Sequence, residues 1–347
     1  MTHIQTRPTR FLIASLALLG AAGCVDSSGP GNVEDPGVLL VPIGQEGYWP
    51  PELVWTKDGG ELIYAENGLS AVSIGTHVVR QLDASPLIVN LVRGNGGEGI
   101  YFGAFLTTQQ GSNDPNFRVS RVNPTAGAAE IITTTFPGAN GDMFVSDDER
   151  FLVVGRGLYD LQTAARIDLP AGRSFGFSPD GTQLLFFVDD GAGLSTPTPT
   201  LISTINGSSQ PLVVSGAFYL AHRWEGNSPK FLTTDLDFNS PIRQLYEIDG
   251  LTGARRHIAD FEANPSFGNA NWSPDGQVLG IWIQQGQLSL RGRRTNLYVI
   301  RSGGAPAIVA NVNESPGPPV FSPNGNSVAY FNYYDGPKRS LYMKSGI

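Results

Sequence analysis

Few side chains in this sequence combine the residue type and the spacing that chemistry requires. His77, His222 and His257 are scattered, and no two of them have the spacing of metal ligands. The stretch at residues 172–176 matches the G-x-S-x-G pattern of a serine nucleophile, but that pattern needs a strand, a sharp elbow and a helix. Here it runs straight into a predicted strand. We therefore expect surface or turn histidines and no catalytic residue.

Three oxygen-bearing side chains, Asp235, Asp237 and Asn239, form the first half of a calcium-binding loop. Such a loop needs glycine at its sixth position and a bidentate glutamate at its last. Ser240 and Tyr246 stand at these positions. We therefore predict a polar loop, no metal and no other cofactor, with calcium binding by the three residues as the alternative.

The elements that would position any site are set by a stretch that the chain repeats. Residues 177–187 read FSPDGTQLLFF, and residues 272–282 and 321–331 follow the same pattern. In each copy an aromatic residue ends one strand, a turn with Ser, Pro and Gly follows, and apolar residues then alternate on the returning strand. Pro, Asp or Asn, and Gly are the residues that a tight turn needs. The pattern predicts a β-hairpin.

A frayed copy at residues 55–64 and three weaker copies extend the repeat along the chain. We interpret Asp58, Asp180 and Asp275 as turn residues rather than catalytic carboxylates. Seven anchors result, 32 to 53 positions apart, and each interval has room for four short strands. The anchors are Trp55, Val92, Val145, Phe177, Trp224, Trp272 and Phe321. We predict an all-β domain at residues 37–347, a single β-propeller of seven four-stranded blades, with six or eight blades as alternatives.

The seventh repeat ends without a fourth strand, whereas the apolar stretch at residues 38–42 has no repeat of its own. We expect this N-terminal strand to close the ring as the outer strand of the last blade. Pro42 suits that position, because proline is tolerated on an edge strand.

The repeated units resemble those of TolB-type, WD-repeat-like β-propellers over about residues 45–347. The resemblance implies the architecture and leaves the function open, because such propellers serve binding proteins and enzymes alike. TolB proteins carry an N-terminal α/β domain and six blades. A TolB-like part in the Tol-Pal system is therefore not carried over to this chain.

The N-terminus resembles a bacterial lipoprotein signal peptide. Residues 1–23 carry Arg7 and Arg10, followed by an apolar run too short to span a bilayer. The AAGC sequence ending at Cys24 is similar to a lipobox, which implies a lipid on Cys24 that anchors the chain to the membrane. Residues 24–36 would then form a flexible tether. The alternative is an ordinary secretory signal with a chance cysteine.

Cys24 is the single cysteine in the sequence, so we expect no disulfide in the domain. By the same resemblance, Val25 rather than Asp after the cysteine implies the outer membrane, with the domain facing the periplasm or the cell surface. Removal of residues 1–23 would leave 21 basic and 31 acidic residues, a net charge of −10. Such a surface repels phosphate backbones, so we expect no nucleic-acid partner. We also expect a monomer.

The predicted links between the second and third strands are long in five of the units. In a propeller these links emerge on one face, and long loops on a rigid scaffold often carry binding residues. Their basic and aromatic side chains are of the types enriched at binding hot spots and favour an acidic partner, with neutral drift of exposed loops as the alternative. The predicted partner-binding residues are Phe238, Arg291, Arg293, Arg294, Tyr333, Tyr334, Lys338 and Arg339.

These features favour a lipid-anchored protein of the cell envelope that binds a protein or an anionic glycan through its long-loop face. One alternative is a lyase or hydrolase that acts on a polymer at the same face. Such an enzyme needs paired carboxylates, and the adjacent Asp189 and Asp190 point apart on a strand. A purely structural envelope component is the other alternative.

Overall fold

The computed structural model describes residues 37–43, 53–65, 68–85, 87–94, 97–105, 117–125, 129–133, 143–189, 198–214, 219–234, 242–262, 265–284, 295–312, 317–333 and 339–347. The chain divides into two units, Met1–Glu34 and Asp35–Ile347, and every described residue belongs to the second. The predicted signal peptide, Cys24 and the tether therefore lie outside the described residues. Within the described residues, no helix is long and apolar enough to cross a membrane.

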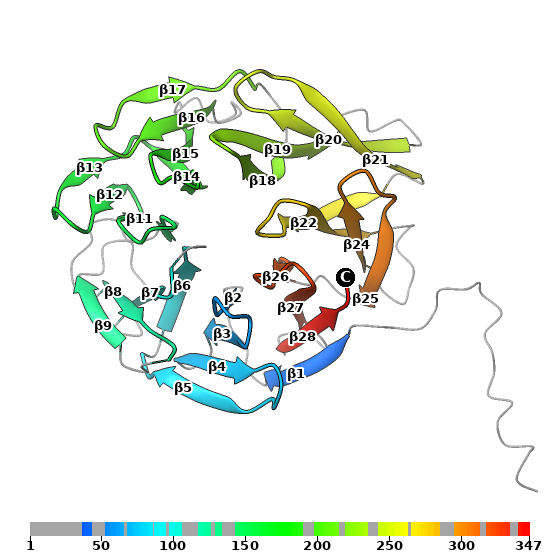
Figure 1. Ribbon diagram of the computed structural model, residues 1–347, viewed down its shortest axis with the longest axis horizontal. Coiled ribbons are helices and arrows are strands. Elements are labelled where there is room, and N and C mark those ends of the chain that lie inside the picture. Colours follow the sequence, from blue (N-terminus) through cyan, green and yellow to red (C-terminus); the bar gives the residue numbers. More distant parts are fainter. Residues whose placement is uncertain are drawn as a thin grey trace, which may run out of the picture. The chain divides into compact units, whose positions relative to one another are not determined.

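The second unit is a ring of seven sheets, each with four antiparallel strands (Figure 1). We name the strands of each blade A to D from the centre outward. Blades 1 to 3 consist of β2 (Leu53–Trp55), β3 (Glu61–Ala65), β4 (Leu69–Ser73) and β5 (Val79–Asp83); β6 (Leu87–Arg93), β7 (Ile100–Phe105), β8 (Phe117–Val122) and β9 (Ala129–Thr133); β10 (Met143–Val145), β11 (Phe151–Val154), β12 (Gly157–Asp160) and β13 (Arg166–Asp168).

Blades 4 to 7 complete the ring in chain order. They consist of β14 (Gly172–Phe177), β15 (Gln183–Val188), β16 (Thr198–Ser203) and β17 (Ser209–Pro211); β18 (Tyr219–Glu225), β19 (Ser228–Thr234), β20 (Ile242–Asp249) and β21 (Arg255–Glu262); β22 (Ser266–Trp272), β23 (Val278–Gln284), β24 (Thr295–Arg301) and β25 (Ala307–Val312); β26 (Val320–Phe321), β27 (Ser327–Tyr333), β28 (Arg339–Ser345) and β1 (Val38–Ile43). The prediction of an all-β, seven-bladed propeller is confirmed. Every predicted anchor lies at or next to the end of an A strand.

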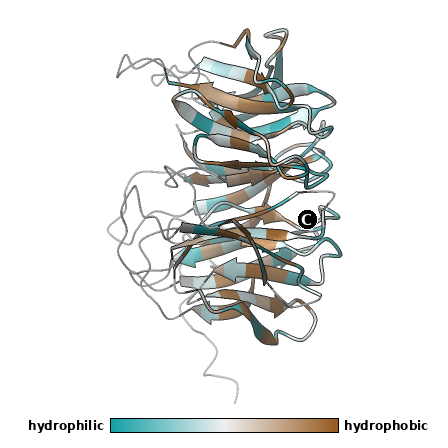
Figure 2. Cartoon of the chain, turned by 90° about the vertical axis from the view of Figure 1, so that its left-hand side faces the viewer, coloured by the Kyte–Doolittle hydropathy of each residue, from teal (hydrophilic) through white to brown (hydrophobic). Residues whose placement is uncertain are grey.

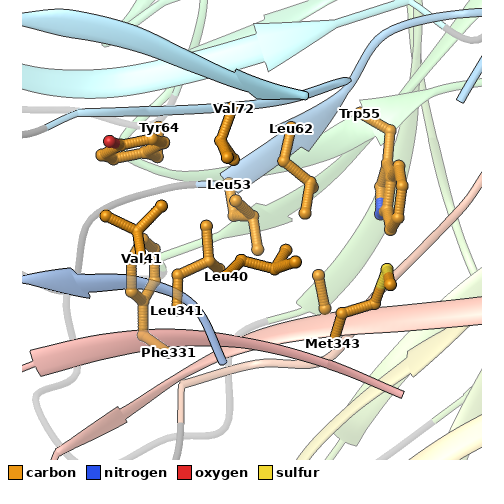
Figure 3. Packing of buried hydrophobic residues seen from close by; sticks show 11 residues of the cluster. Leu40, Val41, Leu53, Trp55, Leu62, Tyr64, Val72, Phe331, Leu341 and Met343 are labelled. Carbon is orange, nitrogen blue, oxygen red and sulfur yellow. The ribbon is translucent and has the colours of Figure 1, made fainter. Parts of the chain in front are cut away.

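The N-terminal strand closes the ring, as predicted. β1 pairs antiparallel with β28 and forms the outer strand of blade 7, with Pro42 opposite Ser340. The register shifts between Leu39 and Val41, and such a bulge lets neighbouring side chains face one side. Leu40 and Val41 are both buried, in a cluster that joins blade 7 to blade 1 (Figure 3).

The A–B turns repeat one set of hydrogen bonds. In blade 4, Ser178 Oγ donates to Asp180 Oδ1 at 2.6 Å and accepts the N–H of Gln183 at 3.0 Å. Asp180 Oδ1 also accepts the N–H of Thr182 at 3.0 Å. The same bonds recur at Thr56 and Asp58, Ser146 and Asp148, Ser273 and Asp275, and Ser322 and Asn324. The interpretation of Asp58, Asp180 and Asp275 as turn residues therefore holds.

The fourth residue after the anchor takes a left-handed conformation in these turns. It is glycine in four of them, for example Gly181 at φ 68° and Gly276 at φ 68°. In blade 3 the residue is Glu149, at φ 59°. A side chain there costs backbone energy, and it must be offset by contacts that the glycines lack.

Apolar clusters fill the interface between every pair of neighbouring blades. Between blades 6 and 7, for example, the ring of Trp282 meets that of Tyr330 edge to face, with centroids 4.8 Å apart. Seen edge-on, apolar segments run through the strands of the stacked blades (Figure 2). These clusters join the seven blades into one ring, and its two faces carry different sets of segments that connect the strands.

Candidate functional site

The connections of the ring separate into two faces. The A–B and C–D turns lie on one face, which we call the turn face, and the B–C and D–A links lie on the other, the link face. Blade 3 has a tight B–C turn at Gly155 and Arg156, between β11 and β12. In five other blades the B and C strands are joined by residues 106–116, 189–197, 235–241, 285–294 and 334–338.

Most of the predicted partner-binding residues lie in these links and outside the described residues. This applies to Phe238, Arg291, Arg293, Arg294, Tyr334 and Lys338, and to the calcium alternative at Asp235, Asp237 and Asn239. Tyr333 ends β27 and Arg339 begins β28, and the two residues are register partners at the link face of blade 7. The structure therefore places these two together at the base of one predicted loop.

Two polar residues that the sequence analysis missed lie at the bases of the blade 6 and blade 7 links. Thr295 begins β24 and Asn332 precedes the last residue of β27. Side chains alternate along a strand, so Thr295 faces the same side as Leu297, and Asn332 the same side as Tyr330. Leu297 and Tyr330 belong to the cluster between blades 6 and 7. Thr295 and Asn332 therefore both face that interface.

Three buried polar atoms at this interface have no hydrogen-bond partner. Thr295 Oγ1, Asn332 Oδ1 and Trp282 Nε1 are all enclosed and unpaired, on side chains that are only 1 to 2% exposed. Leaving such a group unpaired costs about 1–3 kcal/mol. The sequence did carry a signal. Thr295 follows Arg294 and Asn332 precedes Tyr333, and each of these two polar residues stands where the alternation of its strand calls for a buried apolar one.

A central channel opens on the turn face. A cavity of about 420 Å³ lies there, lined by the inner strands of all seven blades. His222 is half-buried in its wall, at an edge-to-face ring contact with Phe175 (centroids 5.9 Å apart). Surrounding protein atoms lower the pKa of His222 to about 4, because they desolvate the charged ring.

The prediction that His77, His222 and His257 lie at the surface or in turns was wrong for His222. β18 carries it into the channel wall, a position that a lone histidine in a strand pattern does not reveal. His77 lies exposed in a turn, and His257 on β21 is exposed with Nε2 2.7 Å from Asp260. Within the described ranges, no group of three or more His, Cys, Asp or Glu side chains is arranged to hold a metal ion.

The G-x-S-x-G stretch lies within the extended strand β14, with a bulge between Ser174 and Gly176. Its middle residue, Ser174, is buried, and the hydroxyl has no hydrogen-bond partner. The pattern therefore lacks the elbow that would expose the serine hydroxyl, as its sequence context indicated.

A second cavity on the turn face lies between blades 5 and 6. It has a volume of about 560 Å³, and we call it the blade 5–6 groove. It shares Arg223, Trp224 and Gly276 with the lining of the channel cavity, so the two are neighbours. The remaining lining includes Glu225, Lys230, Glu247, Asp249, Arg256, Asp275, Gln277 and Ser302.

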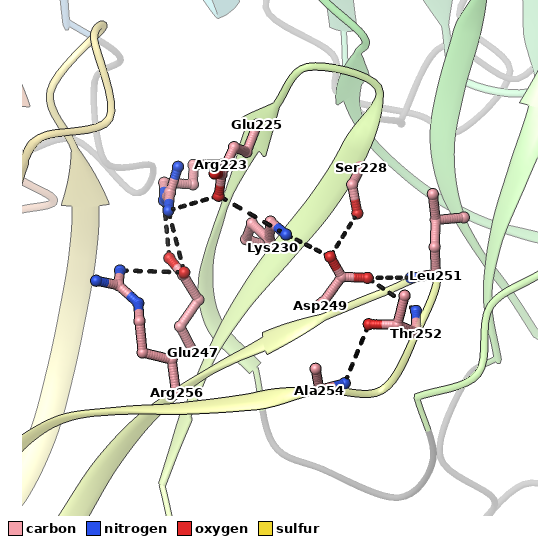
Figure 4. Close-up of polar contacts among 10 residues, drawn as sticks. All are labelled: Arg223, Glu225, Ser228, Lys230, Glu247, Asp249, Leu251, Thr252, Ala254 and Arg256. Carbon is pink, nitrogen blue, oxygen red and sulfur yellow. Dashed lines mark hydrogen bonds and ion pairs between the residues drawn. The ribbon is translucent and has the colours of Figure 1, made fainter.

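A chain of ion pairs forms the base of this groove (Figure 4). Glu247, whose side chain is 5% exposed, accepts two hydrogen bonds from Arg223 at 2.8 and 3.0 Å and one from Arg256 at 3.1 Å. Lys230 pairs with Asp249. Burial alone would raise the pKa of Asp249, but hydrogen bonds from Lys230, Thr252 and Ser228 hold it well below its ordinary value.

Glu225 connects the Arg223–Glu247 pair and the Lys230–Asp249 pair through two longer contacts. Its carboxylate lies 3.3 Å from Arg223 and 3.7 Å from Lys230, and its side chain is 61% exposed. Arg223 also stacks on Trp272 of blade 6, with the guanidinium carbon 5.1 Å from the ring centroid. The groove is thus a polar opening with fixed cations at its base.

Comparison with known proteins finds relatives in structure only. No family model matches the chain, and a search of curated proteins found no match. The fold is similar to an oligogalacturonate lyase in complex with manganese (15% identity, TM-score 0.65, 89% of this chain and 92% of that chain). It is also similar to an oligogalacturonate lyase from Vibrio parahaemolyticus (12% identity, TM-score 0.65, 88% and 92%).

These similarities show the fold. At this level of identity they carry no activity over to the chain. TolB from Acinetobacter baumannii is a further structural relative, with 16% identity and a TM-score of 0.44 over 85% of this chain and 63% of that one.

Proposed function

We propose that this protein is a lipid-anchored binding protein of the bacterial cell envelope, whose propeller holds a protein or an anionic glycan against its link face. The observation that supports this most is the group of unpaired polar atoms at the bases of the blade 6 and blade 7 links. Natural proteins rarely bury such atoms, and those that do often use them at a functional site. The links that leave these bases carry the predicted Arg and Tyr residues.

The connections between the strands also support binding at the link face. On the turn face the A–B turns use their own Ser and Asp side chains to satisfy their backbone groups, as in blade 4. On the link face five blades carry long connections instead. Loops of this kind on a rigid ring are a common solution for binding, because the scaffold holds them in place while their sequence is free to vary.

The anchor is part of the proposal. Replacing Cys24 with Ala should abolish incorporation of a labelled fatty acid and release the protein from membrane fractions. Continued labelling of Cys24→Ala would contradict the anchor. The membrane fraction that holds the native protein, outer or inner, tests the predicted outer-membrane location.

A lyase or hydrolase that acts on a polymer is the second candidate, because the chain shares its fold with oligogalacturonate lyases. Two measurements together separate the candidates. Crosslinking in cells identifies a captured partner, and the purified protein is incubated with oligogalacturonate, with and without manganese, while ultraviolet absorbance follows unsaturated products. A captured partner without product supports the binding protein; product formation contradicts it.

A further inference from the structure

The turn of blade 3 shows how a carboxylate fits between two blades of this ring. Glu149 reaches back to blade 2, where Oε2 accepts hydrogen bonds from Arg121 Nε at 2.8 Å and Tyr101 Oη at 3.0 Å. Its Oε1 accepts the N–H of Gly99 at 2.9 Å. A Cβ placed at Gly99 would lie 2.4 Å from Arg121 Nε, so glycine keeps this space open. We call this contact the Glu149 clasp.

The equivalent position of blade 6 carries no side chain. Gly276 stands four residues after the anchor Trp272, as Glu149 stands four after Val145, and both take left-handed φ values, 68° and 59°. A Cβ at Gly276 would point at Arg223 of blade 5, 3.3 Å from its Cδ. Gly276 and Arg223 both line the blade 5–6 groove, so a side chain from this turn would enter the groove against Arg223.

Two cations, Arg223 and Lys230, line the groove beside this turn. Arg223 and Lys230 have side chains that are 13% and 15% exposed, so both reach the groove. Glu247 and Asp249 hold them in place, as the short ion pairs of the base show. Fixed, partly desolvated cations bind an incoming carboxylate without the cost of ordering their side chains.

Glu225 is the group that an incoming carboxylate would displace. Its contacts with Arg223 and Lys230 are the longest in the network, and it is the most exposed acid there. On the wall of the groove, Arg256 uses one nitrogen for Glu247 and is 46% exposed, so it has further donors to offer. Gln277 and Ser302 line the groove as neutral hydrogen-bonding groups.

We propose that the blade 5–6 groove is a docking slot for an acidic side chain of a peptide segment from a partner protein, which takes the place that Glu149 occupies between blades 2 and 3. The occupant is a peptide because the chain itself accommodates a glutamate side chain from a turn at the equivalent place. This slot lies on the turn face, opposite the link face of the proposed function. It stands or falls independently of that function.

Two substitutions with opposite effects test the slot. Gly276→Glu supplies the missing carboxylate from the chain itself, at a φ that Glu149 already tolerates, and should fill the slot. Glu225→Gln removes the competing carboxylate and should strengthen binding. Gly325→Glu is the matched control, because Gly325 holds the same turn position in blade 7 at φ 71°, facing Ser273 rather than a cation.

The probe is a fluorescent oligoglutamate peptide, with an oligoglutamine peptide of equal length as the neutral comparison and a uronate oligosaccharide as competitor. We expect salt-sensitive binding of oligoglutamate, lowered about tenfold or more by Gly276→Glu and raised severalfold by Glu225→Gln. Gly325→Glu and the triple variant Arg291→Ala, Arg293→Ala, Arg294→Ala should bind like the parent. Should Gly276→Glu fail to fold, as judged by melting, Glu225→Gln alone decides.

Equal binding of the glutamate and glutamine peptides would overturn the slot, as would no binding of either. So would parental affinity in a folded Gly276→Glu variant together with no gain in Glu225→Gln. Loss of affinity in the arginine triple variant would move the peptide site to the link face. Binding of the uronate alone would show that the groove takes a glycan and not a peptide.

Discussion

The indole Nε1 of Trp55 donates a hydrogen bond to the carbonyl oxygen of Val320, 2.9 Å away, although the two residues are 265 positions apart. Trp55 ends the A strand of blade 1, and Val320 begins that of blade 7. The outer side of the same junction is covered by Leu40 and Val41 of β1, which contact the cluster that contains Trp55. The first and last blades are thus joined at the channel and at the rim.

Deleting residues 37–43 should therefore open this junction. Burial of Leu40 and Val41 contributes about 1.5–3 kcal/mol each, so the free energy of unfolding should fall by about 3–6 kcal/mol. Deletion of residues 26–32, which removes the same length of chain before the domain, is the control. Thermal melting of both variants checks the prediction, and equal melting temperatures would count against closure by β1.

The Glu149 clasp should be stabilising despite its backbone conformation. Burial raises the pKa of Glu149, but bonds from Gly99, Arg121 and Tyr101 outweigh this and lower it. Glu149→Ala loses these bonds, leaves Arg121 without its partner and keeps the strained φ, so it should cost about 2–4 kcal/mol of unfolding free energy.

Glu149→Gly also loses the bonds but relieves the strain, so it should be more stable than the alanine variant by about 1 kcal/mol. Exposed Glu98→Ala serves as the neutral control. Chemical denaturation measures all three. A glycine variant less stable than the alanine variant would show that the left-handed backbone is not the source of strain.

Removing the unpaired hydroxyl of Thr295 should raise the free energy of unfolding rather than lower it. Thr295→Val keeps the shape and removes a buried polar atom without a partner, so it should stabilise the fold by about 1–2 kcal/mol. Thr200→Val is the matched control, because buried Thr200 donates to the carbonyl oxygen of Thr198 at 3.2 Å and should lose stability. If the proposed function holds, Thr295→Val also weakens partner capture. A fall in its melting temperature would show that the hydroxyl has a partner.

His222 should make stability depend on pH. Its pKa is about 4 in the fold and about 6.5 in the unfolded chain, so the unfolded state binds the proton first as the pH falls. Stability should therefore decrease from about pH 6.5 to about pH 4, by no more than about 3 kcal/mol because the ring keeps some exposure to the channel. His222→Gln should flatten this range of the curve relative to exposed His257→Gln. Parallel curves for the two variants would contradict the assignment.

The repeat carried enough information to predict the ring. Ser178 Oγ bonds to Asp180 and to the N–H of Gln183, all within five residues, so local chemistry favours the same hairpin in each repeat. Closure was also predictable, because the apolar stretch at residues 38–42 belonged to no repeat and the seventh repeat lacked a fourth strand. The first inference depends on contacts between residues close in sequence, and the second on the number of strands in each repeat.

The polar contacts between distant strands and between blades could not be predicted in this way. Glu149 looked like a degraded turn residue, and its role depends on Arg121 and Gly99 of the preceding blade. Arg223 is a channel residue by position, yet its partner Glu247 lies two strands away. Thr295 and Asn332 are ordinary residues in sequence, and only the register of β24 and β27 shows that both face one interface.

The most direct test of the proposed function is capture of the cellular partner by the triple variant Arg291→Ala, Arg293→Ala, Arg294→Ala. The matched control replaces three exposed cations on the turn face outside the groove, Lys57, Arg166 and Arg301, with Ala, and so removes the same charge. Both variants should melt close to the parent. We expect the link-face variant to lose most of the capture and its salt dependence, and the turn-face control to keep both. Equal capture by the two variants would contradict binding at the link face.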